Sequence, residues 1–569
     1  MTETTAPAAE APRHSSAARI GWAILILATL YVCYFSHLGA IGFVGPDEPR
    51  YAWVARDMVE TGDWVTPRLY GKPWFEKPVL YYWGAALCFK LLGVSEAAAR
   101  LPSAISALLA TLALAWFAQR LYGAETACWL LLLLPTTVGM IGFSHAAATD
   151  MPFSAMLTIA MVCAAVVLGL TRNENTPILP RTPWRTPWLA LILFGFFLGL
   201  AVLAKGPAAI ILSSGAVFFW ALFTKRWREA FRLFHPVAIA SFCLTALPWY
   251  IICARRNPDF LRIFIIEHNF KRYLTPEFQH IQPFWFYLPV LLVDSLPWTA
   301  AMLWTAIEGS ASIVGSKRIS PHTLFLLSWS GFVVLFFSLS RSKLPGYILP
   351  SIPAICLIVT RACVAMASAH RKSFRFVIIT AAVILFLLSV LIRVATPHIS
   401  RANEKFGVVA SLIIALMGAA NIFLGIFYPS RYATHLRKLF AASAIVPILL
   451  AVSLTDGLLS SYFRWDPSGR SLSEEIRRDG IPSQELVARV MTRGQRYSLS
   501  FYLHQEVAEW EAEHPREGYL LTGSKYCRGT LGSDFMCEEI PFNLEKTGFF
   551  LYRIERRSSG RLPRSRQPH

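Results

Sequence analysis

The segment 45–51 reads Gly-Pro-Asp-Glu-Pro-Arg-Tyr and follows the first long apolar stretch of the chain. Prolines stop helices and fix the backbone, so the pattern predicts a polar turn at the membrane–water boundary. There Asp47 could align or deprotonate a nucleophile, and Glu48, Arg50 and Tyr51 could bind a substrate. An isolated Asp-Glu pair is more often part of a solvated loop, so a functional role for this pair needs support from other parts of the sequence.

Other charged residues stand at the ends of later apolar stretches. Asp150 opens one stretch, Lys205 closes another before a Gly-Pro pair, and Glu76 and Lys77 precede a proline. Asp150 could instead only cap its helix, and Glu76 could only pair with its neighbour. The remaining candidates are Arg255, Arg256, His268, Arg272, Arg341, Lys343 and Tyr347.

The composition bounds the class of protein. Of the 569 residues, 55% are hydrophobic and only 16% are charged, and many runs of roughly 20 apolar residues occur, each long enough to span a bilayer. The chain is therefore a polytopic α-helical membrane protein. The chain has 54 basic and 35 acidic residues, and the basic residues cluster in short loops between the apolar runs, a pattern that encodes orientation in a membrane. No nucleic-acid motif appears.

The basic loops predict the topology. Residues 1–19 form a disordered cytoplasmic terminus, and residues 20–456 form a membrane domain of about 13 transmembrane helices. The apolar piece 79–94 only dips into the outer leaflet, because a full crossing would place every later basic loop outside. A short amphipathic helix over 50–59 is expected on the membrane surface. The candidate residues then meet at one outer-face cavity.

The last part of the chain changes character. Residues 457–569 alternate charged amphipathic stretches with short apolar runs, which predicts a small α/β domain on the outer side, a structural cap over the cavity. Cys527 and Cys537 are the two cysteines in this polar region, and they could pair in an oxidising compartment.

The collected groups suit one chemistry. Ionisable residues at membrane depth are costly and are therefore functional candidates. Cations stabilise a phosphate leaving group, and carboxylates stabilise an oxocarbenium-like sugar. This combination predicts inverting sugar transfer from a lipid phosphate, with Asp47 and Asp150 as the catalytic pair.

Five motifs in order resemble one family. They start at residues 47, 75, 149, 205 and 343, and the last reads Lys-Leu-Pro-Gly-Tyr. The chain resembles the bacterial lipid A aminoarabinose transferases, which are similar to the protein O-mannosyltransferases within the GT-C class.

This resemblance implies a donor, an acceptor and a location. The donor would be 4-amino-4-deoxy-L-arabinose on undecaprenyl phosphate, and the acceptor the lipid A phosphates, at the periplasmic face of the inner membrane, giving resistance to polymyxin. A divalent metal on Glu76 and His268 is a minor expectation. The alternatives are a protein O-mannosyltransferase-like enzyme and, in another class, a flippase for a lipid-linked substrate, although no internal repeat is found.

Overall fold

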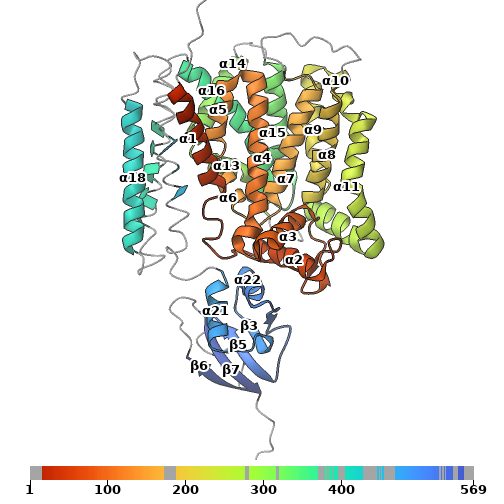
Figure 1. Cartoon of the computed structure of the whole chain (residues 1–569), viewed down its shortest axis with the longest axis vertical. Coiled ribbons are helices and arrows are strands. Elements are labelled where there is room, and N and C mark those ends of the chain that lie inside the picture. The colour runs from red at the N-terminus through yellow and green to blue at the C-terminus, as the bar shows by residue number, and fades with distance from the viewer. Residues whose placement is uncertain are drawn as a thin grey trace, which may run out of the picture.

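The computed structural model describes residues 16–171, 187–275, 281–314, 319–368, 404–426, 468–523, 534–541 and 549–556, with scattered residues elsewhere. Figure 1 shows an upright bundle of helices and, below it, a smaller domain that contains a β-sheet. Short helices, among them α2 and α3, lie between the two at the lower end of the bundle.

The bundle accounts for the apolar stretches of the sequence. Six helices of the described part are long and apolar enough to cross a membrane, or up to eight if each of two bent pairs counts as one span. This makes the chain a multi-pass membrane protein, but the described residues do not confirm the count of thirteen spans. The expected span near 437–456 falls largely outside the described residues, and that near 375–395 does so in part. The bundle helices are α1 (Ser16–Tyr34), α4 (Glu96–Tyr122), α5 (Ala124–Leu133), α6 (Val138–Ser144), α7 (Asp150–Val167), α8 (Trp188–Lys205), α9 (Ala208–Thr224), α10 (Trp227–Phe231), η1 (Arg232–Phe234), α11 (Pro236–Arg256), α13 (Tyr287–Asp294), α14 (Thr299–Val314), α15 (Pro321–Leu339), α16 (Ile352–Ser368) and α18 (Glu404–Ile426).

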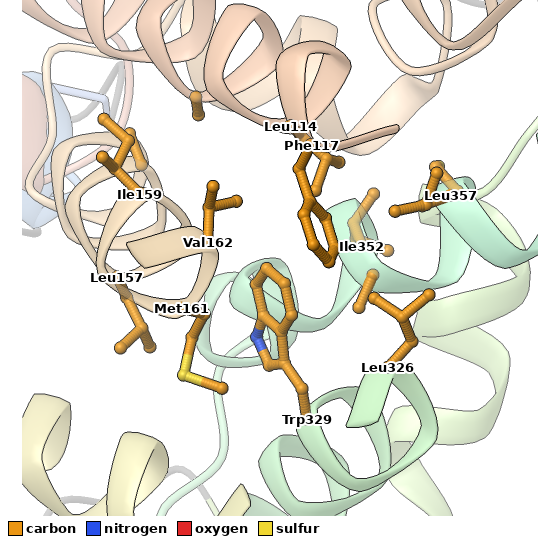
Figure 2. Close-up of a cluster of buried hydrophobic side chains, with 14 of the residues drawn as sticks. Leu114, Phe117, Leu157, Ile159, Met161, Val162, Leu326, Trp329, Ile352 and Leu357 are labelled. Carbon is orange, nitrogen blue, oxygen red and sulfur yellow. The ribbon is translucent and has the colours of Figure 1, made fainter. Parts of the chain in front are cut away.

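The core of the bundle forms around α7. Figure 2 shows Trp329 of α15 surrounded by side chains that include Phe117 of α4, Val162 of α7 and Ile352. In the apolar window of α7, 89% of the residues are buried inside the protein. A helix that is apolar all round is packed on every side. The first residue of α7, Asp150, is consequently held by a rigid central element.

Short elements cover the lower end of the bundle. They are α2 (Asp47–Thr61), the hairpin of β1 (Arg68–Leu69) and β2 (Lys72–Pro73), α3 (Leu80–Leu92), the π-helical η2 (Arg262–Lys271), α12 (Arg272–Leu274), η3 (Phe284–Phe286) and η4 (Pro345–Ser351). With 13 residues α3 is about 20 Å long, too short for a hydrocarbon core of about 30 Å. This agrees with the prediction that 79–94 does not span.

The predicted polar turn is confined to Gly45 and Pro46, because a helix begins directly after them. Asp47 is the first residue of α2, and Pro49 stands in its first turn. A proline is tolerated at that place since the first N–H groups of a helix have no partner within it. The predicted amphipathic helix over 50–59 is present as part of α2, and its apolar face packs inside the protein: Tyr51 is 2% exposed and Met58 0%.

The lower domain contains a mixed five-stranded sheet in the order β4-β3-β5-β7-β6. Strand β3 is parallel to β4 and β5, whereas β7 is antiparallel to β5 and β6. A disulfide joins Cys527 to Cys537. The elements are α21 (Arg470–Arg478), η5 (Ser483–Glu485), β3 (Leu486–Arg489), α22 (Arg493–Leu503), β4 (Ala508–Glu509), β5 (Glu517–Thr522), β6 (Phe535–Ile540) and β7 (Phe550–Arg556).

Polar contacts tie this domain to the bundle. The Tyr502 hydroxyl donates to Glu96 at 2.7 Å and accepts from the backbone N–H of Phe43 at 3.0 Å. Arg470 forms an ion pair with Glu96 at 3.0 Å. Because Glu96 begins α4 and Phe43 precedes α2, the lower domain is fixed against the elements that carry Asp47.

Candidate functional site

Arg50 bridges two of the predicted carboxylates. Its guanidinium donates to Glu76 Oε2 at 2.9 Å and also to Asp47 Oδ1, while its Nε donates to the carbonyl of Pro46 at 2.7 Å. The Arg50 side chain is 5% exposed, whereas that of Asp47 is 49% exposed. Arg50 therefore fixes the orientation of Asp47, and Asp47 is the carboxylate that a substrate can reach.

Glu76 is surrounded by cations. Besides Arg50, the Lys77 ammonium lies 3.7 Å and the Arg272 guanidinium 3.6 Å from its carboxylate. Burial alone would raise the pKa of Glu76, but these three cations outweigh it and hold the pKa at about 2. Glu76 is consequently an anion at any physiological pH, and it organises three cations around one point.

A second ion pair joins the ends of two bundle helices. The Lys205 ammonium, at the end of α8, lies 2.5 Å from Asp150 Oδ1, at the start of α7. Tyr347 of η4 lies against this pair, with its ring centroid 4.7 Å from the Lys205 ammonium. The predicted break at Lys-Gly-Pro is confirmed, because α8 ends at Lys205 and α9 begins at Ala208.

Lys77 and Arg272 connect the two groups. The positive charges of Lys77 and Arg272 lower the pKa of Glu76, and they also attract the carboxylate of Asp150. The Tyr347 hydroxyl is hydrogen-bonded to Arg272. The cluster thus holds four cations against three carboxylates. Residues 47, 50, 76, 77, 150, 205, 272 and 347, predicted from separate motifs, meet in one place.

The cations are held to different degrees. Arg50 and Lys205 make hydrogen bonds to carboxylates, whereas Lys77 and Arg272 approach Glu76 only at ion-pair distance. Burial lowers the pKa of Lys77 to about 8, and Glu76 only partly opposes this effect. A cation of this kind gains most from a phosphate group beside it.

The neighbouring His268 and Tyr51 are uncharged. Burial is the largest effect on both: it lowers the pKa of His268 below its usual value and raises the pKa of the Tyr51 hydroxyl well above its own. His268 is therefore neutral near pH 7. Tyr51 keeps its proton and can donate a hydrogen bond.

The donor set around Glu76 does not fit a divalent metal. Among the described residues no group of three or more His, Cys, Asp or Glu side chains could hold a metal ion. Glu76 already contacts Arg50, Lys77 and Arg272, and a divalent ion beside it would be repelled by all three. We derive no step through the expected metal on Glu76 and His268.

Glu48 belongs to a different network from Asp47. Its carboxylate accepts from Arg100 at 2.8 and 2.9 Å and from the backbone N–H groups of Val44 at 3.0 Å and Ala147 at 2.8 Å. These partners occupy both carboxylate oxygens. Glu48 thus joins α2 to α4 and to the loop before α7, and we do not include it among the groups that contact a substrate.

Four further predicted cations form no ion pair with the carboxylates of the cluster among the described residues. Arg255 and Arg341 are exposed, and Arg256 pairs with Asp63 at 3.2 Å. Lys343 is buried, and its ammonium donates to the carbonyls of Ser340 at 2.5 Å and Gln282 at 3.1 Å. Lys343 therefore holds the turn before η4 instead of facing Asp150.

Tyr82 was not predicted, although it lies beside the cluster. Its buried hydroxyl has no hydrogen-bond partner among the described residues, its ring packs 5.8 Å from that of Tyr51, and the charges of Glu76 and Arg50 act on it. The signal in the sequence was the Tyr-Tyr-Trp run that follows Lys77. A buried hydroxyl without a partner is available to a bound ligand.

A largely apolar cavity of about 500 Å³ lies elsewhere, between α8, α9, α10 and α11. Leu198 is its lining residue closest along α8 to Lys205, and the two stand seven positions, about 10 Å of helix, apart. No charged residue lines this cavity, so it cannot perform the chemistry of the cluster.

Comparisons with known proteins show which family and which fold the chain is similar to. A family model for dolichyl-phosphate-mannose-protein mannosyltransferase matches residues 20–264. The crystal structure of ArnT from Cupriavidus metallidurans bound to undecaprenyl phosphate is similar with a TM-score of 0.74 and 21% identity, over 94% of this chain and 98% of that chain. This likeness confirms the GT-C fold.

Two curated relatives are more similar in sequence. The undecaprenyl phosphate-alpha-4-amino-4-deoxy-L-arabinose arabinosyl transferase of Aeromonas salmonicida is 30% identical over 443 residues, 76% of each chain. The protein of the same name from an Enterobacter species is 30% identical over 426 residues, 74% of this chain and 69% of that protein. The chain belongs to the family of undecaprenyl phosphate-alpha-4-amino-4-deoxy-L-arabinose arabinosyl transferases.

Proposed function

We propose that the chain transfers 4-amino-4-deoxy-L-arabinose from undecaprenyl phosphate to a phosphate group of lipid A, at the periplasmic face of the inner membrane. Membership of the transferase family supports the donor sugar and its carrier. The observation that carries the proposal is the cluster of four cations and three carboxylates at one end of the membrane bundle.

The cations fit the leaving group. A sugar joined to a lipid phosphate carries one negative charge, and the freed lipid phosphate carries up to two. The cluster has one cation more than it has carboxylates, so it gains favourable interactions as this charge develops. Lys77 and Arg272, which approach Glu76 only at ion-pair distance, are the cations that we assign to the leaving phosphate.

The carboxylates fit the sugar and the acceptor. An oxygen of the lipid A phosphate attacks the anomeric carbon, the bond from that carbon to the lipid phosphate oxygen breaks, and its electron pair leaves with undecaprenyl phosphate. Attack from the opposite face inverts the anomeric centre. Asp47 aligns the acceptor, whose phosphate is already ionised at pH 7 and needs no base. Asp150, held by Lys205, faces the positive charge that develops on the sugar.

The Cys527–Cys537 disulfide supports the periplasmic location. Disulfides persist in oxidising compartments such as the bacterial periplasm and are rare in the cytoplasm. The domain that holds it contacts the elements around Asp47, so the domain and the site would lie on the same side of the membrane.

Mass spectrometry of lipid A tests the proposal. Cells that make the wild-type chain should add the mass of the aminopentose to lipid A phosphates. Asp47→Asn should reduce transfer by roughly 100-fold or more, while the protein still inserts in the membrane. The control is Asp259→Asn, a carboxylate that is 71% exposed in a surface ion pair, and it should keep wild-type activity.

The match to the mannosyltransferase family model favours a second candidate, transfer to a protein hydroxyl. In that case Asp47 would have to remove a proton from the acceptor. Unmodified lipid A together with sugar on a protein acceptor would replace the first proposal by the second. Wild-type transfer by Asp47→Asn would refute the assigned site in both cases.

A further inference from the structure

Helix α22 of the lower domain packs directly on the segment that leads into Asp47. A Cβ at Gly494 would lie 2.9 Å from the carbonyl carbon of Gly45, so only a glycine fits at this contact. One turn later the Ser498 hydroxyl donates to the carbonyl of Phe43 at 2.9 Å. The first two turns of α22 thus form part of the wall around the Asp47 segment.

Tyr497 brings this helix into contact with the cluster. Its buried ring lies 5.3 Å from the Arg50 guanidinium, which is the group that holds Asp47 and Glu76. An aromatic face attracts a guanidinium and restricts its position. The lower domain therefore supplies one of the groups that orient Arg50, and through Arg50 it orients Asp47.

Arg493 extends the same row of contacts toward solvent. Its Nε donates to the Tyr497 hydroxyl at 3.2 Å, and its guanidinium lies 5.4 Å from the centre of the Tyr497 ring. Asp47, Arg50, Tyr497 and Arg493 form an unbroken sequence of contacts from the bundle to the lower domain.

The charge of Arg493 is not neutralised by a carboxylate among the described residues. Arg496, on the next turn of α22, pairs with Glu509 at 2.8 Å, but Arg493 takes part in no ion pair of the described part of the chain. Arg493 is also exposed. An exposed guanidinium, already held at its Nε, presents its remaining N–H donors in a plane that matches a phosphate group.

We infer that Arg493 binds the phosphate of the acceptor lipid and that Tyr497 is a positioning residue for both Arg493 and Arg50. This inference rests on the proposed function. The donor phosphate already has Lys77 and Arg272, which come from elements of the membrane bundle. Arg493 approaches from the lower domain, outside the bundle, where the phosphorylated headgroup of a second lipid would lie.

Steady-state kinetics on the full-length protein test this assignment, with purified donor lipid and with lipid A in mixed micelles. Arg493→Gln should raise KM for lipid A about tenfold, the effect of losing one charge-assisted hydrogen bond, and leave KM for the donor unchanged. The matched control is Arg553→Gln, which removes one exposed arginine from β7 of the same domain and should keep both KM values.

Tyr497→Phe separates positioning from packing. The ring over Arg50 stays, but the hydroxyl that holds Arg493 is lost, so KM for lipid A should rise while kcat stays near the wild-type value. Because both residues act through the same contact, Tyr497→Phe should add little to Arg493→Gln in the double variant.

The outcomes separate this inference from the proposed function. If the wild-type protein does not transfer the sugar to lipid A, the proposed function fails. If the wild-type protein does transfer it, an unchanged KM for lipid A in Arg493→Gln overturns the role of Arg493. A raised KM for the donor instead would assign Arg493 to the donor phosphate and also overturn it.

Discussion

The ammonium of Lys205, the last residue of α8, lies 2.5 Å from the carboxylate of Asp150, the first residue of α7. Each charge stands at the helix end that favours it, since the N-terminus of a helix is partly positive and the C-terminus partly negative. Both side chains are largely buried, so each depends on the other for compensation. The pair therefore acts as a unit.

Replacing either residue of this pair should lower kcat/KM about as much as replacing both. Lys205→Met leaves the Asp150 carboxylate without its partner, and we expect kcat/KM to fall by roughly 100-fold. Asp150→Asn should lower kcat/KM by a similar factor. The fall in the double variant should be far smaller than the product of the two single-variant factors. Kinetics of the three variants measure this coupling.

A pair elsewhere in the bundle provides the control. Arg226 and Glu229 form an ion pair at 3.2 Å at the start of α10, which lies at the opposite end of the bundle from α2 in Figure 1. Arg226→Met should leave kcat/KM unchanged. If the fall in kcat/KM of the double variant equals the product of the falls in Lys205→Met and Asp150→Asn, the two residues do not act as a unit.

The sequence predicted the residues whose position depends on local structure. Asp150 and Lys205 were found because an apolar stretch begins or ends at them, and helix ends in a bundle meet at a common surface. The start of α2 was missed, because the prolines around Asp47 were taken as a stop signal, whereas a proline in the first turn is compatible with a helix.

Contacts between distant parts of the chain could not be predicted in this way. Glu48 was assigned to the site because it is adjacent to Asp47, but successive residues of a helix point in different directions, and its partner Arg100 is 52 residues away. Tyr497 contacts Arg50 across most of the chain. No local spacing encodes such pairs, which depend on how the elements pack.

The charge of Lys77 predicts how activity depends on pH. Burial lowers its pKa to about 8, so it is an ammonium below that pH and a neutral amine above it. If the ammonium attracts the donor phosphate, kcat/KM for the donor should fall as pH rises above about 8. In the bound complex the phosphate favours the charged form, so the decline in kcat should begin at higher pH.

Lys77→Arg tests the origin of this decline. A guanidinium stays charged throughout the accessible range, so the fall in kcat/KM above pH 8 should disappear even if the variant is slower. Initial rates at limiting donor between pH 6 and pH 10 give both profiles. An identical alkaline decline in Lys77→Arg would assign it to another group.

The Glu48–Arg100 pair should matter for folding. Arg100 donates to both oxygens of Glu48 and to the carbonyls of Leu38, Ile41 and Gly42. Arg100→Leu leaves a buried carboxylate and three carbonyls without this partner, and it should destabilise the protein by about 3–5 kcal/mol. Thermal unfolding in detergent measures the loss.

A surface arginine is the matched control for Arg100. Arg262 pairs with Asp259 at 3.2 Å, but its side chain is 58% exposed. Arg262→Leu should cost about 1 kcal/mol or less. A melting temperature of Arg100→Leu equal to that of Arg262→Leu would show that the buried pair is not needed for stability.

The final prediction concerns the close approach of η4 to Asp150. A Cβ on Gly346 would lie 2.7 Å from Asp150 Oδ1 and 2.8 Å from the ring of Phe143, so Gly346→Ala must displace one of them. We expect a stability loss of about 1–3 kcal/mol and reduced kcat, because Asp150 moves relative to Lys205. Gly331→Ala is the control, since a Cβ there meets nothing within 4 Å in the interior of α15, and it should keep activity and stability. Wild-type kcat in Gly346→Ala would mean that Phe143 is displaced and Asp150 keeps its place, which would contradict the expected movement of Asp150.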